Sequence, residues 1–354
     1  MKKFIWMSMA VLTILVAACS NDEVKNNVLN PNEEKVSMTI NLNGEQGFSR
    51  AIGLPSVSEE STLHNLGIYV FDASNDLEKF TYFTTDLNQA NLQKEISGLT
   101  KGPKSVVILA NLGSQDDYPA TTTPTTYTAL KDSKLNWVDL PKSKDNLATM
   151  GLPMSGESTT VLQPGDANTV AITLSRLVAK VRLAKVTIEN AGSHVPVNLT
   201  KVGVLNELAR VGTIHGDAEE TPSLLHGLGT TVTEGLWNSI SNSYATPDSA
   251  NALYYYLLPY HDAASKENAT MMSLVSEQDG STKYFSFVIN PPRDGIAADK
   301  TYLRRNSQYA LSVTLKYHET GTETPGEINF DASVNVEISV EPWVDELGHD
   351  EIWD

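Results

Sequence analysis

Strict alternation of apolar and polar residues restricts the fold of this sequence more than any other feature. The alternation runs without a break from residue 328 to 340 and appears again over residues 36–42. Successive side chains of a β-strand point to opposite faces of a sheet, so each run predicts a strand with one buried face. The predicted inward residues are Val36, Met38, Ile40 and Leu42 in the first run, and Ile328, Phe330, Ala332, Val334, Val336, Ile338 and Val340 in the second.

Most other regular segments are also predicted to be strands, because they are short, rich in branched and aromatic residues, and bounded by turn-forming residues. A short helix is predicted over 127–131 and a long strand over 176–188. The pattern predicts an all-β chain of two β-sandwiches in series with few short helices, divided near residue 175. The other predicted strands cover 66–71, 104–110, 161–162, 169–174, 202–205, 252–258, 270–275, 284–289 and 309–316.

The N-terminus has the organisation of an export signal. Lys2 and Lys3 precede an apolar stretch over residues 4–16, which is shorter than the roughly 20 residues that a helix needs to span a bilayer. Small residues then lead into Cys19, the single cysteine of the chain, in a pattern that resembles the bacterial lipobox. One cysteine cannot form an internal disulfide, and this one is predicted to carry lipid that attaches the precursor to a membrane. Residues 20–34 are polar and are predicted to form a tether.

The net charge of −17 limits the partners of the chain. An acidic protein repels nucleic-acid phosphates and anionic lipid headgroups, so neither is an expected ligand. A hydrophobic content of 40 % with 19 % charged residues is ordinary for a folded globular protein.

No catalytic or metal-binding motif appears in the sequence. The seven histidines form no HExxH or HxH pattern, and GxSxG, P-loop and GxGxxG sequences are missing. We therefore expect no enzymatic activity, no cofactor and no metal. Asp72 and Asp76 could bind calcium, but their segment lacks the final Glu of an EF-hand loop and favours a hairpin turn.

Several segments, taken in their order along the chain, resemble the FimA-type fimbrillins, the major stalk subunits of type V pili in Bacteroidota. The first are the lipoprotein signal and the alternating strand followed by Ser49-Arg50-Ala51. The last is the alternating strand that closes on Glu341-Pro-Trp343. The resemblance implies two transthyretin-like β-sandwiches and assembly by strand exchange. The segments between are Ile68–Phe71, Val106–Asn111, Arg176–Val181 and Leu303–Asn306 leading to Tyr309.

The same resemblance implies roles for both ends of the chain. An arginine-specific protease would cut between Arg50 and Ala51 and remove Cys19 together with the strand from Val36 to Leu42. A C-terminal strand of the next subunit would then fill the open groove. After Arg50 the next arginine is Arg176, so no competing site lies between them. The donor-strand candidates are Val334, Val336, Ile338, Val340, Trp343, Leu347, Ile352 and Trp353, and Ser249 matches an O-glycosylation pattern of this bacterial group.

The resemblance also implies a layout and a set of partners. The expected partners are identical subunits, pilus anchor and tip subunits and the arginine-specific protease. The expected location is the cell outer membrane for the lipidated precursor and an extracellular fimbrium, supporting adhesion and biofilm formation, for the processed chain. The predicted parts are a signal peptide (1–19), a tether with the removable strand (20–50), an N-terminal sandwich (51–175), a C-terminal sandwich (176–327) and a donor segment (328–354).

Two other functions stay open at this point. A lipid-anchored pilus anchor or accessory subunit would keep its lipid and leave Arg50 uncut. A surface glycan-binding β-sandwich lipoprotein would use the aromatic residues from Tyr254 to Tyr260, or Trp237, as a stacking platform for sugars.

Overall fold

The structure is a computed structural model of the chain. It describes residues 35–44, 57–88, 92–121, 125–142, 144–165, 167–189, 197–225, 237–241, 253–260, 269–278, 280–292, 295, 301–316, 321–323 and 334–342. Residues 35–354 form one compact unit.

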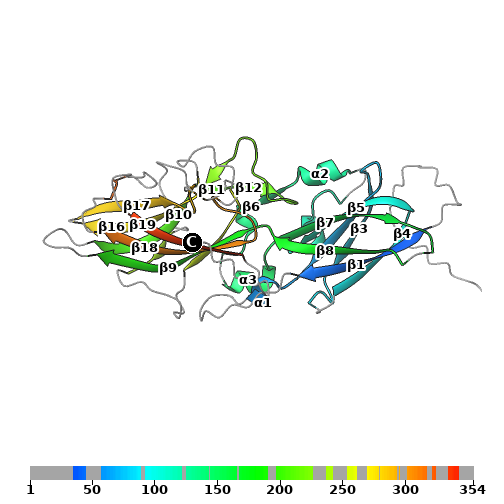
Figure 1. Ribbon diagram of the computed structural model, residues 1–354, viewed down its shortest axis with the longest axis horizontal. Helices are drawn as coiled ribbons and strands as arrows, with labels where there is room; N and C mark the ends of the chain where they lie inside the picture. The colour runs from blue at the N-terminus through cyan, green and yellow to red at the C-terminus, as the bar shows by residue number, and fades with distance from the viewer. Residues whose placement is uncertain are drawn as a thin grey trace, which may run out of the picture. The chain divides into compact units, whose positions relative to one another are not determined.

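The first half of this unit is built on a seven-stranded sheet with the order β3-β2-β5-β7-β8-β1-β4 (Figure 1). β7 and β8 pair only at Met154↔Arg176 and Ser155↔Ser175, so the sheet bends there into two layers. Both layers supply side chains to one apolar cluster, which makes this half a β-sandwich. The strands are β1 (Val36–Gly44), β2 (Leu66–Phe71), β3 (Leu77–Phe83), β4 (Leu92–Leu99), β5 (Gly102–Ala110), β7 (Met154–Leu162) and β8 (Thr169–Arg176).

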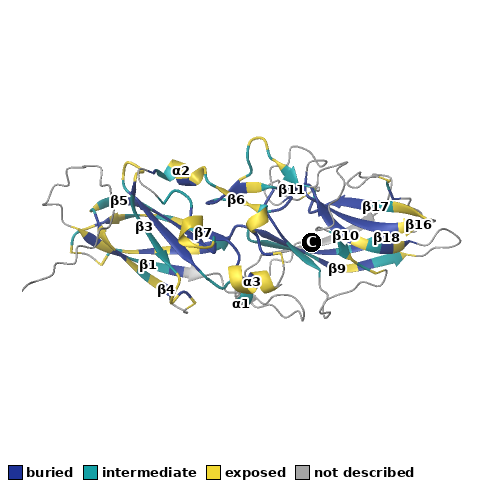
Figure 2. Ribbon diagram, turned by 180° about the vertical axis from the view of Figure 1, so that it is seen from behind, coloured by how far each residue is buried: buried dark blue, intermediate teal, exposed yellow. Residues whose placement is uncertain are grey.

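The apolar strand β2 is buried along its whole length. Figure 2 shows the buried segments of this half in dark blue. Leu66, Ile68 and Val70 face the sandwich core. Tyr69 and Phe71 face the opposite side of the sheet. That side is covered by Leu130 of the short helix α2 (Tyr127–Lys131) and by Ile214. Two covered faces explain why the sequence of β2 is continuously apolar and not alternating.

The second half contains two four-stranded sheets with the orders β14-β10-β16-β17 and β15-β9-β18-β19. A second apolar cluster contains residues from both sheets. The strands are β9 (Ala179–Glu189), β10 (Asn198–Leu205), β14 (Asn238–Ser239), β15 (Tyr254–Leu257), β16 (Met271–Gln278), β17 (Ser281–Val288), β18 (Ser307–Lys316) and β19 (Val334–Pro342).

The same order of strands occurs twice along the chain. β1 lies between antiparallel β4 and parallel β8, and β9 lies in the same way between antiparallel β15 and parallel β18. The facing layers β3-β2-β5-β7 and β14-β10-β16-β17 also correspond. On this repetition we propose that the chain divides near residue 175, with β9 as the counterpart of β1.

The remaining elements are short. They are α1 (Val57–Glu60), α3 (Lys144–Met150), the 3₁₀ turns η1 (Gln115–Asp117) and η2 (Trp137–Asp139), and the strands β6 (Lys134–Asn136), β11 (Glu207–Leu208), β12 (Arg210–Gly212) and β13 (Leu224–Leu225). Within the described ranges, no helix is long and apolar enough to cross a membrane.

The structure confirms the predicted all-β, sandwich-like fold class, and α2 has the predicted bounds. The hairpin turn predicted over 72–76 is also confirmed, because Asp72 Oδ1 accepts hydrogen bonds from the amides of Ser74 (2.8 Å) and Asp76 (3.1 Å). The single strand predicted over 176–188 is wrong in one respect. β8 ends at Arg176 and β9 begins at Ala179, and the two residues between bond elsewhere: Leu177 N donates to Pro153 O and Val178 O accepts from Asn306 N.

Candidate functional site

The predicted removable strand is an inner strand of its sheet. β1 runs parallel to β8 from Thr39↔Thr169 to Gly44↔Leu174. On its other side it runs antiparallel to β4, from Val36↔Leu99 to Leu42↔Leu92. Both edges of β1 are therefore paired, so its departure would leave two rows of unpaired backbone groups.

The four predicted inward residues of β1 are buried. Val36 and Leu42 keep 8 % and 6 % of their surface exposed, and Met38 and Ile40 keep none. We call the space that β1 fills the slot. It is the gap between β4 and β8, and it borders the apolar cluster of the first half. The slot is apolar wherever it meets these side chains. The buried residues that β4 and β8 contribute to the same cluster are Leu92, Ile96, Leu99, Val170, Ile172 and Leu174.

The burial of β1 predicts an alternating response to alanine substitution. Ile40→Ala is expected to lower the free energy of unfolding of the uncut chain by roughly 2–4 kcal/mol, because it leaves a cavity in the slot. Thr39→Ala, on the opposite face of the same strand, is expected to cost less than about 1 kcal/mol. Urea unfolding of both variants measures the difference, and equal losses would contradict the described register.

Several predicted site residues lie outside the described residues. These are Cys19, Arg50, Ala51 and Ser249. β1 ends at Gly44 and α1 begins at Val57, so Arg50 lies in the connection between two described elements. The donor candidates Trp343, Leu347, Ile352 and Trp353 also lie outside the described part of the chain.

The last alternating run forms β19 at an edge of its sheet. β19 pairs antiparallel with β18 from Ser307↔Pro342 to Leu315↔Val334. This places the backbone of Val334, Val336, Ile338 and Val340 in the subunit's own sheet, and their side chains are not described. The first six residues of the predicted strand, 328–333, lie outside the described ranges.

A buried ionic cluster holds the helix α1 that follows the Arg50 connection. Glu60 and Lys180 of β9 are almost fully buried, and Lys180 Nζ lies 2.6 Å from Glu60 Oε1. The hydroxyl of Tyr256 donates to the same oxygen at 2.6 Å. Arg176 adds donations to Glu60 O (3.3 Å) and Ser61 Oγ (2.7 Å). Burial lowers the pKa of Lys180, and the nearby Glu60 carboxylate opposes this shift.

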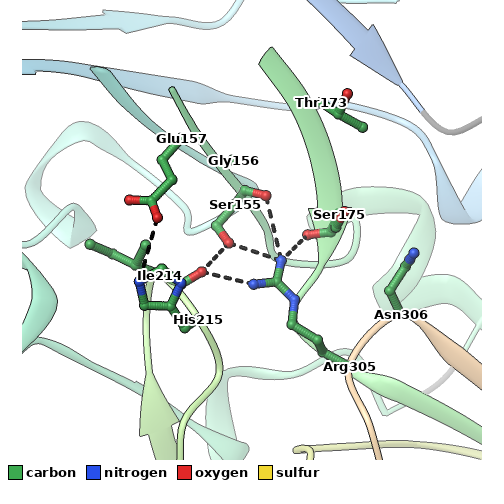
Figure 3. A pocket seen from close by; sticks show the side chains of 9 residues that line it. All are labelled: Ser155, Gly156, Glu157, Thr173, Ser175, Ile214, His215, Arg305 and Asn306. Atoms are coloured by element: carbon green, nitrogen blue, oxygen red, sulfur yellow. Dashed lines mark hydrogen bonds and ion pairs between the residues drawn. The ribbon is translucent and has the colours of Figure 1, made fainter. Parts of the chain in front are cut away.

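A pocket of about 330 Å³ is lined by Ser175, the residue before Arg176, and has the Arg305 guanidinium in its wall (Figure 3). The guanidinium donates to Ile214 O (2.9 Å), Ser175 O (2.8 Å) and Ser155 Oγ (3.0 Å), and its Nε donates to Arg176 O (3.2 Å). Several donors are thus occupied by the protein itself, which indicates a structural role.

The pocket forms where β7 and β8 part. A Cβ atom on Gly156 would lie 2.4 Å from the carbonyl oxygen of Thr173, so only glycine fits at this crossing. Nearby, Glu157 lies 3.6 Å from His215 Nε2 and accepts from the hydroxyl of Tyr127 at 2.8 Å. Both members of the Glu157–His215 pair are more than a third exposed, so the pair contributes little to stability.

The aromatic residues considered as a sugar platform serve mainly in packing. Tyr256 and Tyr260 keep only 5 % and 4 % of their surface exposed. The ring of Trp237 lies against the backbone of Gly203, where an added Cβ would approach it to 2.7 Å. Tyr256 and Tyr260 therefore offer no open face for a sugar, whereas Tyr254, Tyr255 and Trp237 are half-buried.

Glu207 gives the fold a predictable dependence on pH. Burial raises the pKa of Glu207 from 4.5 to about 8, and the charge of Lys142 opposes this. The folded state therefore holds a proton that the unfolded state has lost, and stability falls as the pH rises. Between pH 5 and 8 we expect a loss on the order of 3 kcal/mol from this group.

Urea unfolding at several pH values tests this expectation. Glu207→Gln should remove this part of the pH dependence and be more stable than the parent chain at pH 8. The exposed Glu95→Gln is the matched control and should follow the parent chain. Parallel curves for Glu207→Gln and the parent chain would contradict the assignment.

The sequence and the fold both match known fimbrial proteins. Residues 35–201 match the family described as major fimbrial subunit protein (FimA). The predicted resemblance to FimA-type fimbrillins is thereby confirmed. No curated protein matches the sequence.

Solved structures of fimbrial proteins share the fold of this chain at low sequence identity. The fimbrilin FimA from Porphyromonas gingivalis is 19 % identical, with a TM-score of 0.64, over 87 % of this chain and 98 % of that one. A C-terminally truncated tip fimbrial protein, Mfa3, from the same organism is 13 % identical, with a TM-score of 0.50, over 88 % and 100 %.

Sequence reasoning missed the residues that hold the chain together near α1 and the pocket. Glu60 lies in the polar stretch Ser58-Glu-Glu-Ser61, where a buried charge has no local signal. Arg305 stands in a segment that carried the resemblance, Leu303-Arg-Arg-Asn306, but no role followed from the motif.

Proposed function

We propose that the chain is a stalk subunit of a pilus, exported as a lipoprotein on Cys19, cut after Arg50 and polymerised by strand exchange. Its proposed partners are identical subunits, anchor and tip subunits and an arginine-specific protease. The precursor would reside at the outer membrane and the product in an extracellular fimbrium. The family match supports a structural subunit and not an enzyme.

One observation carries the proposal: β1 is an inner strand that is paired on both edges and precedes the Arg50 connection. A single cut after Arg50 would leave β1 held by noncovalent contacts alone. Its four inward side chains contribute on the order of 6–12 kcal/mol from burial, at roughly 1.5–3 kcal/mol each. A replacing strand must supply a comparable amount, and alternating apolar residues can do so.

We propose that the replacing strand comes from residues 328–354 of the next subunit. β19 is an edge strand, so its release breaks one ladder of hydrogen bonds, whereas β1 is held by two. The tail beyond Pro342 supplies further apolar side chains at Trp343, Leu347, Ile352 and Trp353. Truncation after Pro342 separates exchange through β19 from exchange that requires the tail.

The test is the N-terminal residue and intact mass of the protein recovered from the cell surface. A chain that begins at Ala51 and runs as SDS-resistant high-mass ladders supports the proposal. A chain that begins at acylated Cys19 and is always monomeric contradicts it and supports an anchor or accessory subunit.

A further inference from the structure

Asn168 contacts the main chain of β1 at the mouth of the slot. It is the residue before β8, at the end of the turn from β7. Its carbonyl oxygen accepts a hydrogen bond from Thr39 N at 2.8 Å. Its side-chain Nδ2 donates to Ser37 O at 3.1 Å. These contacts extend the β1–β8 ladder beyond its first paired residues, Thr39↔Thr169, and neither of them depends on a side chain of β1.

The same side chain is fixed by its own turn. Gln163 N donates to Asn168 Oδ1 at 2.8 Å, and Asn168 Nδ2 donates to Gln163 O at 3.0 Å. Gln163 directly follows Leu162, which is paired with Gly102 of β5. None of these bonds involves β1. The donor and the acceptor of Asn168 therefore keep their positions when β1 leaves, and a group that is already in place binds at a lower entropic cost.

We propose that Asn168 is a main-chain clamp of the slot: it holds β1 in the precursor and binds the replacing strand in the same way. The second half of this inference rests on the proposed strand exchange. The clamp requires a carbonyl oxygen at one residue and an amide N–H two residues later. A proline at the position of Thr39 is excluded, because it has no N–H.

The C-terminal segment meets this requirement. Pro342 is the single proline in residues 328–354. It follows the apolar residues Val334, Val336, Ile338 and Val340 at the same two-residue spacing, so in an extended strand it belongs to the same face as they do. A strand that points these apolar residues into the slot places odd-numbered residues at the positions of Ser37 and Thr39. Pro342 then never occupies the Thr39 position, so the clamp accepts any register that buries the side chains of Val334, Val336, Ile338 and Val340.

Amide hydrogen exchange on the uncut full-length chain tests the clamp. Asn168→Asp keeps the acceptor for Gln163 N, loses both Nδ2 donations and places a carboxylate beside two carbonyl oxygens. We expect the amides of residues 39–42 to exchange about three- to tenfold faster, the effect of one typical hydrogen bond. Amides of β2 and β5 should keep their rates, because a general loss of stability would change all of them.

Gly165→Ala is the control for the turn. Gly165 has φ +75° and open space around it, so alanine strains the turn without touching β1. This variant should leave the β1 amides unchanged. Unchanged β1 exchange in Asn168→Asp would overturn the proposal, and so would equal acceleration in Gly165→Ala.

A second experiment separates the clamp from the strand exchange itself. The full-length chain is nicked within residues 45–56 and incubated with a synthetic peptide of residues 35–44. Uptake should be about three- to tenfold weaker in Asn168→Asp than in the parent chain. A parent chain that never takes up the peptide counts against the proposed strand exchange, and the hydrogen-exchange result then decides the role of Asn168 in holding β1.

Discussion

Arg50→Lys is expected to leave the chain uncut at the cell surface and to abolish SDS-resistant ladders. Lysine keeps the positive charge but is not a substrate for an arginine-specific protease. In the uncut chain β1 stays tethered, and a tethered strand has an effective concentration in the millimolar range or higher at its own slot. An incoming strand from another subunit cannot compete at ordinary concentrations.

The matched control is Arg210→Lys, which makes the same change in an exposed residue that is ion-paired with Glu219 at 2.8 Å. This variant should be processed and should form ladders like the parent chain. Immunoblots of unboiled surface fractions, with N-terminal sequencing, measure both outcomes. Ladders of normal mass from the Arg50→Lys chain would refute release at this residue.

Lys180→Met is expected to lower the free energy of unfolding by about 3–5 kcal/mol, because it leaves Glu60 buried without its cation. Glu60→Gln should cost a similar amount for the converse reason. The double variant removes both charges and should recover roughly half of the summed loss. Tyr256→Phe should cost about 1–2 kcal/mol, since it deletes one hydrogen bond to a charged group.

Urea unfolding of the parent chain and the four variants measures these changes in the free energy of unfolding. Losses that simply add would show that Glu60 and Lys180 do not act as a pair. The result also bears on assembly, because α1 follows the Arg50 connection and would lie near the new N-terminus of a cut chain. A weakened pair should therefore loosen α1 more than it loosens β5, and hydrogen exchange can show this.

Local pattern predicted the strands well where one rule decided the outcome. The alternation of residues 36–42 identified β1 and its four inward residues, because a period of two has one structural meaning. The Asp72 turn and α2 also followed from nearby residues. The placement of β1 between β4 and β8 did not, because the partner residues 92–99 and 169–174 lie far away in sequence.

Long-range polar contacts were equally invisible in the sequence. Glu60 bonds Tyr256 across almost two hundred residues, and Arg305 bonds the backbone of Ser175. The sequence contains no periodicity or motif for such pairs, since each is defined only when the strands are assembled. The break at Leu177 and Val178 was missed for the same reason: both residues are apolar, and only their bonds to Pro153 and Asn306 end the strand.

For the proposed strand exchange, the inner position of β1 would determine the order of events. An edge strand can depart and be replaced later. An empty inner position, in contrast, would expose the apolar slot together with unpaired backbone groups of β4 and β8 on both sides. The favourable route would be stepwise displacement. The incoming strand of the next subunit would first pair at one end of the slot and then replace β1 residue by residue. Both strands would then occupy parts of the slot at every intermediate stage, and the rate would depend on how readily the first few residues of β1 dissociate.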